Sequence, residues 1–258
     1  MNNEAVLALF DRQMRRDSPA DGPGATVERV GRVVRHAGPD PVWNAILWSD
    51  LDEECAEREI AAQVRHFAAL DREFEWKLYA HDTPGDLGER LLAAGFTAEP
   101  AEALMVAEAE DQLHDVVLPE GVELVPVTDA AGIALMRTVH EQAFGGDASR
   151  LARAMEQQLA EAPETLVAVV AVADGAPVSA ARMELVPGTE FAGLWGGGTA
   201  EAWRGRGIYR ALVAHRARVA VERGYRFLQV DASDRSEPIL RRLGFTRLST
   251  TTPYVRRP

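Results

Sequence analysis

The order of apolar and polar positions along the chain predicts alternating strands and helices. Period-two alternation or a short continuous apolar run indicates a strand, whereas apolar positions three or four residues apart indicate a helix. These patterns predict strands over residues 27–35, 42–48, 73–80, 104–107, 122–127, 166–172, 178–185, 190–199 and 224–232, with a last strand around Tyr254. They predict helices over residues 2–16, 53–70, 86–94, 129–144, 148–160, 208–223 and 236–243. The chain is therefore expected to be an α/β (α+β) protein.

One stretch carries glycine and arginine where a predicted strand meets a predicted helix. The strand over 190–199 thins to glycine at 196–198 before the turn begins. The turn and the start of the helix contain Arg204, Gly205, Arg206, Gly207 and Arg210. A glycine turn before a helix exposes backbone N–H groups at the positive end of the helix dipole, which suits an anion and above all a phosphate. The spacing lacks the Gly-Lys-Ser/Thr of a P-loop and the third glycine of a dinucleotide-binding fingerprint.

The turn resembles the pyrophosphate-binding motif of the GNAT acyltransferase superfamily, Arg/Gln-x-x-Gly-x-Gly/Ala. Arg204 and Gly207 match this motif, while Tyr209 departs from its last position. The predicted strand at 224–232 and a helix that ends in Gly-Phe at 244–245 follow in the superfamily's order and spacing. The alternative explanation, a capped surface turn, accounts for the glycines and arginines but not for the downstream order.

The resemblance implies that a coenzyme A thioester, most simply acetyl-CoA, is the acyl-donor cosubstrate. In this superfamily the strands before and after the motif splay apart, and the pantetheine arm lies in the gap, paired to the first strand. The residues that this implies for cofactor binding are Gly197, Gly198, Thr199, Arg204, Gly205, Arg206, Gly207, Ile208, Tyr209 and Arg210. A bulge in the strand is the alternative explanation for the glycines at 196–198.

Acyl transfer to an amine also needs a base for the amine and a proton for the leaving thiolate. The superfamily often donates that proton from a tyrosine four residues before the glycine of the Gly-Phe pair, but Leu240 stands there. The candidates for the catalytic acid and base are Glu184, Glu190, Ser236 and Tyr254, with His140 as a further base. Each also has a structural explanation, namely exposed strand carboxylates, a helix N-cap, a core tyrosine and a structural histidine. Tyr209 is expected to pack against the following helix.

The N-terminal half faintly repeats the C-terminal half. Ile46-Leu47-Trp48 resembles Gly193-Leu194-Trp195, and the Gly-Phe pair at 95–96 corresponds to that at 244–245. Residues 50–54, Asp-Leu-Asp-Glu-Glu, occupy the place of the glycine turn, and four carboxylates would repel a pyrophosphate. The resemblance therefore implies two GNAT-like domains, each a mixed, largely antiparallel twisted sheet flanked by helices. The first, over 1–115, is degenerate, and the second, over 116–258, is an acetyltransferase domain; unrelated α/β segments are the alternative.

Composition and charge narrow the choice of partners. The 258 residues are 47% hydrophobic and 26% charged, with a formal net charge of −12, which argues against nucleic-acid binding. The chain shows neither an apolar run of membrane-spanning length nor a signal segment. Its single cysteine, Cys55, permits no internal disulfide and has no neighbouring metal ligands. We therefore expect a cytoplasmic monomer or homodimer that needs no metal and does not bind membranes.

The favoured hypothesis is an acyl-CoA-dependent N-acyltransferase, most simply an N-acetyltransferase, in which a small-molecule or peptide primary amine attacks the thioester directly. One alternative is a non-catalytic acyl-CoA-binding or sensor protein, which Leu240 at the tyrosine position suggests. Another is an interaction protein that docks an acidic partner on its basic C-terminal segment, since residues 201–258 contain thirteen arginines and five acidic residues.

Overall fold

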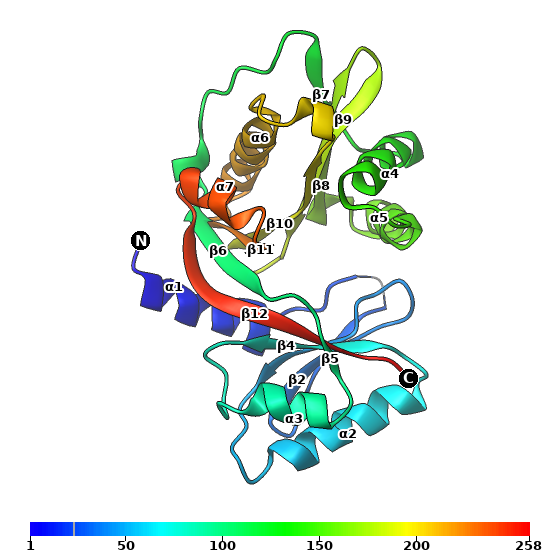
Figure 1. Cartoon of the computed structure of the whole chain (residues 1–258), viewed down its shortest axis with the longest axis vertical. Coiled ribbons are helices and arrows are strands. Elements are labelled where there is room, and N and C mark those ends of the chain that lie inside the picture. The colour runs from blue at the N-terminus through cyan, green and yellow to red at the C-terminus, as the bar shows by residue number, and fades with distance from the viewer. Residues whose placement is uncertain (23) are drawn as a thin grey trace. The chain divides into compact units, whose positions relative to one another are not determined.

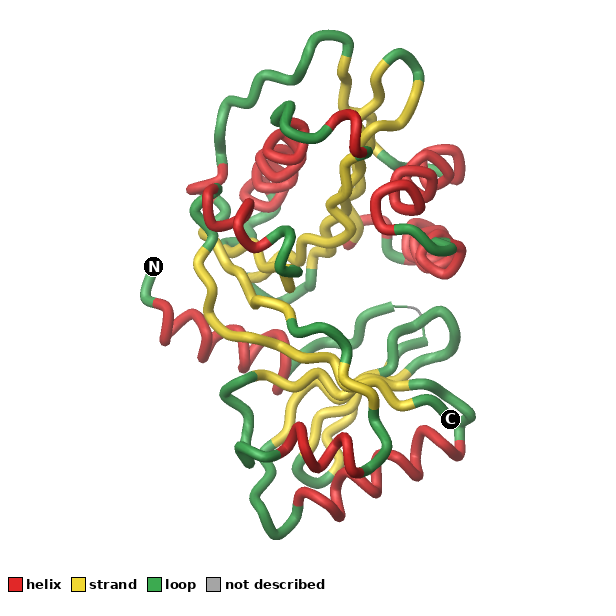
Figure 2. Tube along the Cα trace, viewed as in Figure 1, coloured by secondary structure: helices red, strands yellow, loops and turns green. Residues whose placement is uncertain are grey.

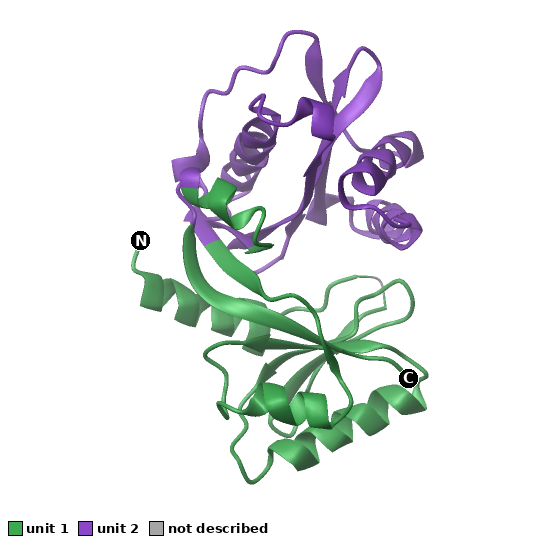
Figure 3. Ribbon diagram, in the orientation of Figure 1, with its two compact units in different colours: residues 1–105, 231–241, 246–258 green, residues 106–230, 242–245 purple. Residues whose placement is uncertain are grey.

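The computed structural model describes residues 1–22 and 24–258, which form two compact units (Figure 3). Unit 1 comprises Met1–Met105, Asp231–Arg241 and Thr246–Pro258, and unit 2 comprises Val106–Val230 and Arg242–Phe245. The end of the chain therefore belongs to the same unit as its beginning. The expected domain boundary at 115–116 stays a prediction, because units defined by contacts do not follow a single cut in the chain.

Unit 1 contains a mixed sheet. Its strands are β1 (Thr26–Val30), β2 (Val33–Ala37), β3 (Ala45–Ser49), β4 (Phe74–Tyr79), β5 (Thr97–Ala98), β6 (Glu102–Glu108) and β12 (Thr246–Arg256). Hydrogen bonding sets the order β1-β2-β3-β4-β12-β6, with β5 beside β12. The pairs β1–β2, β2–β3 and β4–β12 are antiparallel, whereas β3 and β4 are parallel. The last residues of β6 belong to unit 2.

The helices of unit 1 cover both faces of this sheet (Figures 1 and 2). The helices α2 (Ala56–Ala69) and α3 (Leu87–Ala93) bury their apolar stripes against Phe74 and Trp76 of β4. Because side chains alternate along a strand, Tyr79 lies on the side of β4 away from Leu78. There it meets Phe10, at the end of α1 (Asn3–Phe10), with ring centroids 5.9 Å apart. A π-helical turn, η1 (Asp11–Arg16), continues α1.

The part of the sheet that lies in unit 2 is also mixed and mostly antiparallel. Its strands are β7 (Val122–Pro126), β8 (Leu166–Ala173), β9 (Ala176–Leu185), β10 (Phe191–Thr199) and β11 (Phe227–Ala232), in the order β11-β10-β9-β8-β7. Only β10 and β11 are parallel among these neighbours, and the other pairs are antiparallel. The helices of unit 2 are α4 (Ala130–Phe144), α5 (Ser149–Glu161) and α6 (Ile208–Glu222). The short turn η2 (Glu110–Gln112) lies between β6 and β7, η3 (Pro163–Thr165) joins α5 to β8, and η4 (Glu201–Trp203) joins β10 to α6. The helix α7 (Glu237–Arg242) lies almost wholly in unit 1.

The sheet of unit 2 separates two apolar layers. On one face, α4 and α5 pack against alternate residues of β8 such as Ala168 and Val170. On the other face, Ile208 and Leu212 of α6 pack against the remaining alternate residues of β8, such as Val169. Figure 1 shows α4 and α5 on one side of the strands and α6 on the other. Because β8 is buried on both faces, its residues form a nearly continuous apolar run. The start of α4 is capped as expected, since Asp129 accepts a hydrogen bond from Gly132 N at 2.8 Å.

The predicted fold class is confirmed: helices flank a mixed, mostly antiparallel sheet. The prediction of one strand over 27–35 is wrong, because the chain forms the hairpin β1–β2 there, with Val30 opposite Val33. Gly31 turns the hairpin with φ 60°, a left-handed conformation that glycine adopts readily. Within residues 1–22 and 24–258, none of the helices combines the length and apolarity needed to cross a membrane.

Candidate functional site

Strands β10 and β11 separate part-way along their length. Their parallel register runs from Phe191 opposite Phe227 to Gly193 opposite Gln229 and, in the described part of the chain, goes no further. Strand β10 nevertheless continues to Thr199. The sheet therefore opens beyond Gly193, on the side of β10 that faces away from β9. This is the kind of opening that the GNAT resemblance implies for a pantetheine arm.

A bulge deforms β10 where the opening begins. The register with β9 shifts between Trp195 and Gly198. A Cβ atom on Gly197 would lie 2.9 Å from the ring of Tyr209, and one on Gly198 would lie 2.8 Å from Cβ of Ala143 in α4. Both distances are shorter than carbon atoms tolerate, so the glycines are required by close packing from two sides. The bulge that was the alternative explanation is therefore present, and it lies at the opening.

The glycine turn between η4 and α6 is open to solvent. Gly205 has φ 73°, and Gly207, the N-cap of α6, has φ 83°. A Cβ atom on either residue would meet no atom within 4 Å, so glycine is needed there for its backbone conformation, which costs other residues roughly 1–2 kcal/mol. The first backbone N–H groups of α6 face this turn, as a phosphate site requires.

The basic side chains of the turn lie beside these N–H groups. Arg204, Arg206 and Arg210 are exposed. Arg204 Nε donates to the backbone oxygen of Thr199 at 3.1 Å, and the Arg206 guanidinium lies 4.6 Å from the centre of the Trp203 ring. Ile208 is buried in the core, so only its backbone can serve a ligand. The structure thus brings together the residues predicted for cofactor binding, in one turn and the adjoining strand end.

Polar side chains gather on the α4 face of the sheet next to the opening. Glu184 of β9 stands opposite Gly193 in the register and accepts a hydrogen bond from Arg182 Nε at 3.1 Å. His140 of α4 packs its ring 4.8 Å from that of Phe144, and its buried Nδ1 has no hydrogen-bond partner within the described residues. Burial, with a smaller contribution from the Arg182 charge, lowers the pKa of His140 and so favours the neutral imidazole.

Three other predicted catalytic residues lie elsewhere. Glu190 lies just before β10, at the end where β10 pairs with β11, and its carboxylate is 3.7 Å from the guanidinium of Arg226. The opening begins at the far end of this pairing, beyond Gly193. Ser236 donates its hydroxyl hydrogen bond to the backbone oxygen of Ser233 at 3.2 Å, in the turn that leads into α7. Tyr254 belongs to β12 of unit 1 and packs into the core of that unit.

Two residues on α6 carry more than the sequence indicated. Tyr209, expected to pack against the following helix, lies with its ring against Gly197 of β10. Arg216, which in the sequence resembles an arginine of a solvated helix face, is 1% exposed. In the sequence, only its spacing from Tyr209 indicates where it lies. Arg216 follows Tyr209 by seven residues and is therefore on the same side of the helix.

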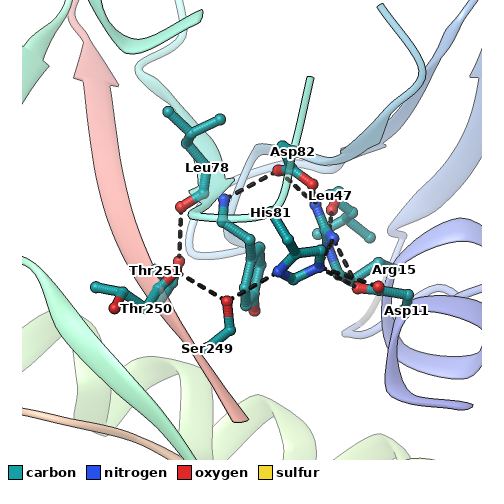
Figure 4. Close-up of polar contacts among 10 residues, drawn as sticks. Asp11, Arg15, Leu47, Leu78, His81, Asp82, Ser249, Thr250 and Thr251 are labelled. Atoms are coloured by element: carbon teal, nitrogen blue, oxygen red, sulfur yellow. Dashed lines mark hydrogen bonds and ion pairs between the residues drawn. The ribbon is translucent and has the colours of Figure 1, made fainter. Parts of the chain in front are cut away.

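Unit 1 has a corresponding opening between β3 and β4. Their parallel register comprises Ala45 opposite Glu75 and Ile46 opposite Trp76, and the described residues give no pair beyond these. The backbone oxygen of Leu47, the next residue of β3, accepts a hydrogen bond at 3.1 Å from Nε of Arg15. A side chain from η1 therefore reaches the backbone of β3 just beyond its last pair with β4, and Figure 4 shows this contact of Arg15 with Leu47.

The guanidinium of Arg15 is held on every side (Figure 4). Both carboxylate oxygens of Asp82 accept from its Nη2 at 2.7 Å, and Asp11 accepts from its Nη1 at 2.7 Å. Its carbon Cζ lies 4.1 Å from the centre of the Tyr79 ring. Burial opposes the charge, but these anions raise the pKa of Arg15. The opening in unit 1 is thus occupied by a charged side chain of the same chain.

The described residues contain no cluster of three or more His, Cys, Asp or Glu side chains that could hold a metal ion.

Residues 133–245 match the model of the Acetyltransferase (GNAT) family. This segment contains the β10–β11 opening, the bulge and the glycine turn. This segment of the chain therefore matches a domain of the GNAT family, a family of acyl-CoA-dependent acyltransferases. None of the curated proteins matches its sequence.

Solved structures extend the likeness of the fold to nearly the whole chain. A GCN5-related N-acetyltransferase from Kribbella flavida is similar with a TM-score of 0.69 and 21% identity, covering 98% of this chain and 93% of that one. A functionally unknown conserved protein from Staphylococcus epidermidis has a TM-score of 0.69 and 16% identity, covering 94% and 96%. A tandem GNAT protein from the clavulanic acid biosynthesis pathway has a TM-score of 0.61 and 14% identity, covering 92% and 85%. At these identities the likeness concerns the fold alone.

Proposed function

We propose that this protein is an N-acetyltransferase that transfers an acetyl group from acetyl-CoA to a primary amine by direct attack. The observation that carries the proposal is the combination of the opening beyond Gly193 with the solvent-exposed turn at Gly205 and Gly207. The pyrophosphate would be held by the N–H groups at the start of α6 and by the arginines of the turn. The pantetheine arm would run from there along the free edge of β10 towards Gly193.

The acceptor amine would approach from the α4 face. Glu184, opposite Gly193, is the proposed base that takes the amine proton, and neutral His140 is the second candidate. Glu190 is not favoured, because it lies at the paired end of β10. The proposal does not use Cys55 as a nucleophile, because this residue is buried in unit 1.

In this proposal the chain is a tandem GNAT protein whose N-terminal domain does not bind coenzyme A. Two features support the assignment. The acidic stretch 50–54 stands where the glycine turn would be, and the guanidinium of Arg15 is bonded to Leu47 O in the opening of unit 1.

We expect one coenzyme A to bind per chain. A second pantetheine arm would have to displace Arg15 from Asp82, whose side chain is 5% exposed, and leave a buried carboxylate without its partner. Isothermal titration of the full chain with acetyl-CoA should give a stoichiometry near one. A stoichiometry of two would contradict the assignment of a non-binding N-terminal domain.

Thiol release tests the activity itself. The full chain is incubated with acetyl-CoA and a panel of amines that includes polyamines, amino acids, aminoglycosides and peptides with free N-termini, and free thiol is followed. Release that depends on one class of amine supports the proposal and names the acceptor class. Tight binding of acetyl-CoA without release for any amine would favour the non-catalytic acyl-CoA-binding alternative.

A further inference from the structure

Arg216 is a buried cation without an anionic partner. Its Nε donates to Leu212 O of its own helix at 3.0 Å, and its Nη1 donates to Arg182 O of β9 at 2.9 Å. Both acceptors are backbone oxygens, and no carboxylate of the described residues pairs with it. Burial lowers the pKa of Arg216 to about 10. Retaining an unpaired buried charge costs stability, which suggests that a negative charge develops nearby.

The position of this cation points to the opening. Arg182, whose oxygen it binds, stands opposite Trp195 in the register, and the bulge of β10 begins there. Arg216 therefore lies under the part of β10 that borders the opening, on the α6 side of the sheet.

Tyr209 links the cation to the opening. Its ring edge lies so close to Gly197 that a Cβ atom there would be 2.9 Å from Cε2. Among the described residues no protein atom forms a hydrogen bond with its hydroxyl. Burial raises the pKa of this hydroxyl, while the Arg216 charge acts in the opposite direction. Tyr209 thus combines an unbonded phenol with a nearby cation that can stabilise the phenolate.

Two departures from the GNAT pattern fit together here. The position at which the superfamily often carries its acidic tyrosine holds Leu240, which is fully buried. The position at which it usually carries glycine or alanine holds Tyr209. The chain therefore lacks a tyrosine at position 240 and carries an additional one at position 209.

We propose that Tyr209 is the general acid of the transfer reaction and that Arg216 stabilises the phenolate it becomes. The amine nitrogen attacks the thioester carbon and forms the C–N bond. The C–S bond then breaks, its electron pair goes to sulfur, and the Tyr209 hydroxyl gives sulfur a proton, so that coenzyme A leaves as the thiol. The proton lost by the amine goes to the base and passes from there through water to the phenolate, which restores both groups. Tyr209 is the catalytic residue, and Arg216 acts through it.

The inference rests on the proposed function, and a change of leaving group separates the two. The assay compares acetyl-CoA with its selenoester analogue, in which selenium replaces sulfur and all other binding groups are unchanged. A selenolate is a far weaker base than a thiolate and leaves without a proton. The amine is the best acceptor from the thiol-release panel. A wild-type protein that transfers acetyl from neither donor overturns the proposed function.

The decisive variant is Tyr209→Phe, which removes only the hydroxyl. We expect kcat with acetyl-CoA to fall by roughly 100-fold, the lower end of what general acid catalysis contributes, because a coenzyme A thiolate is already a fair leaving group. KM for acetyl-CoA and kcat with the selenoester should stay within about threefold of wild type. Tyr225→Phe, the same change just beyond the end of α6, is the matched control. It should leave kcat with both donors unchanged. If Tyr209→Phe lowers kcat equally with both donors, or with neither donor, the assignment of Tyr209 as the acid is wrong.

Arg216 is tested by keeping or removing its charge. Arg216→Met should reproduce the loss that is selective for the thioester, and Arg216→Lys should retain most of the activity. Ultraviolet titration of tyrosinate, taken as the difference from Tyr209→Phe, should show a higher pKa for Tyr209 in Arg216→Met, because the cation that lowers it is gone. An unchanged pKa in folded Arg216→Met would overturn the role of Arg216 whatever the activity.

Discussion

Gly207→Glu is expected to abolish measurable acetyl-CoA binding while the protein remains folded. Gly207 is exposed at the N-cap of α6, and the space around its missing Cβ is empty, so the new side chain meets no clash. Its carboxylate would occupy the anion site itself and pair with the arginines of the turn. Charge-assisted hydrogen bonds contribute about 1.5–3 kcal/mol each, so the loss of two weakens binding by at least roughly 100-fold.

The control for this variant is Gly207→Ala. Alanine brings the same strain at φ 83° without a charge, so any effect of the backbone alone appears in both variants. Calorimetry should show a modest change in affinity for alanine and no binding for glutamate, with circular dichroism reporting that both are folded. Wild-type affinity in folded Gly207→Glu would show that the cofactor lies elsewhere.

Arg15→Ala is expected to destabilise unit 1 more than any single change at a surface arginine. Arg15 is 2% exposed, and its removal leaves Asp82 buried without a countercharge and the Leu47 oxygen without its donor. Breaking a buried ion pair from one side typically costs about 3–5 kcal/mol. Urea unfolding followed by tryptophan fluorescence should show the loss, since Trp43, Trp48 and Trp76 lie in unit 1.

The neighbouring Arg16 supplies the matched control. Its contact with Asp17 at 3.2 Å joins two side chains that are about half exposed, and such surface pairs contribute little to stability. Arg16→Ala should therefore unfold like the wild type. Equal unfolding midpoints for Arg15→Ala and Arg16→Ala would mean that the opening of unit 1 does not depend on its internal arginine.

Local sequence signals sufficed for most elements and for the anion turn. The helix over 129–144 and the apolar strand over 166–172 were predictable because each has a clear period and clear end signals. Gly205 and Gly207 were predictable because a left-handed turn before a helix restricts the residue type at those positions. The hairpin at Gly31 was missed, since Val27–Arg35 alternates on both sides of a two-residue turn and alternation alone does not reveal where a strand reverses.

The partner of the last strand was beyond the reach of the sequence. Strand β12 pairs with β4, with Tyr254 opposite Trp76, a partner that lies far away in the sequence. Asp231, at the end of β11, likewise forms an ion pair with Lys77 of β4. A strand's own pattern states which residues are buried but not which distant strand supplies its hydrogen bonds.

The sequence by itself determined the period of most elements, the glycine turn and the acidic stretch at residues 50–54. These depend on neighbouring residues, whose backbone preferences and charges act over a few positions. Only the tertiary structure decided what lies in each opening: Arg15 between β3 and β4, and the ring of Tyr209 against Gly197 with Arg216 buried behind it. From the sequence alone, an arginine is predicted to be a surface residue. Whether it is buried depends on the assembled fold and not on the residue type.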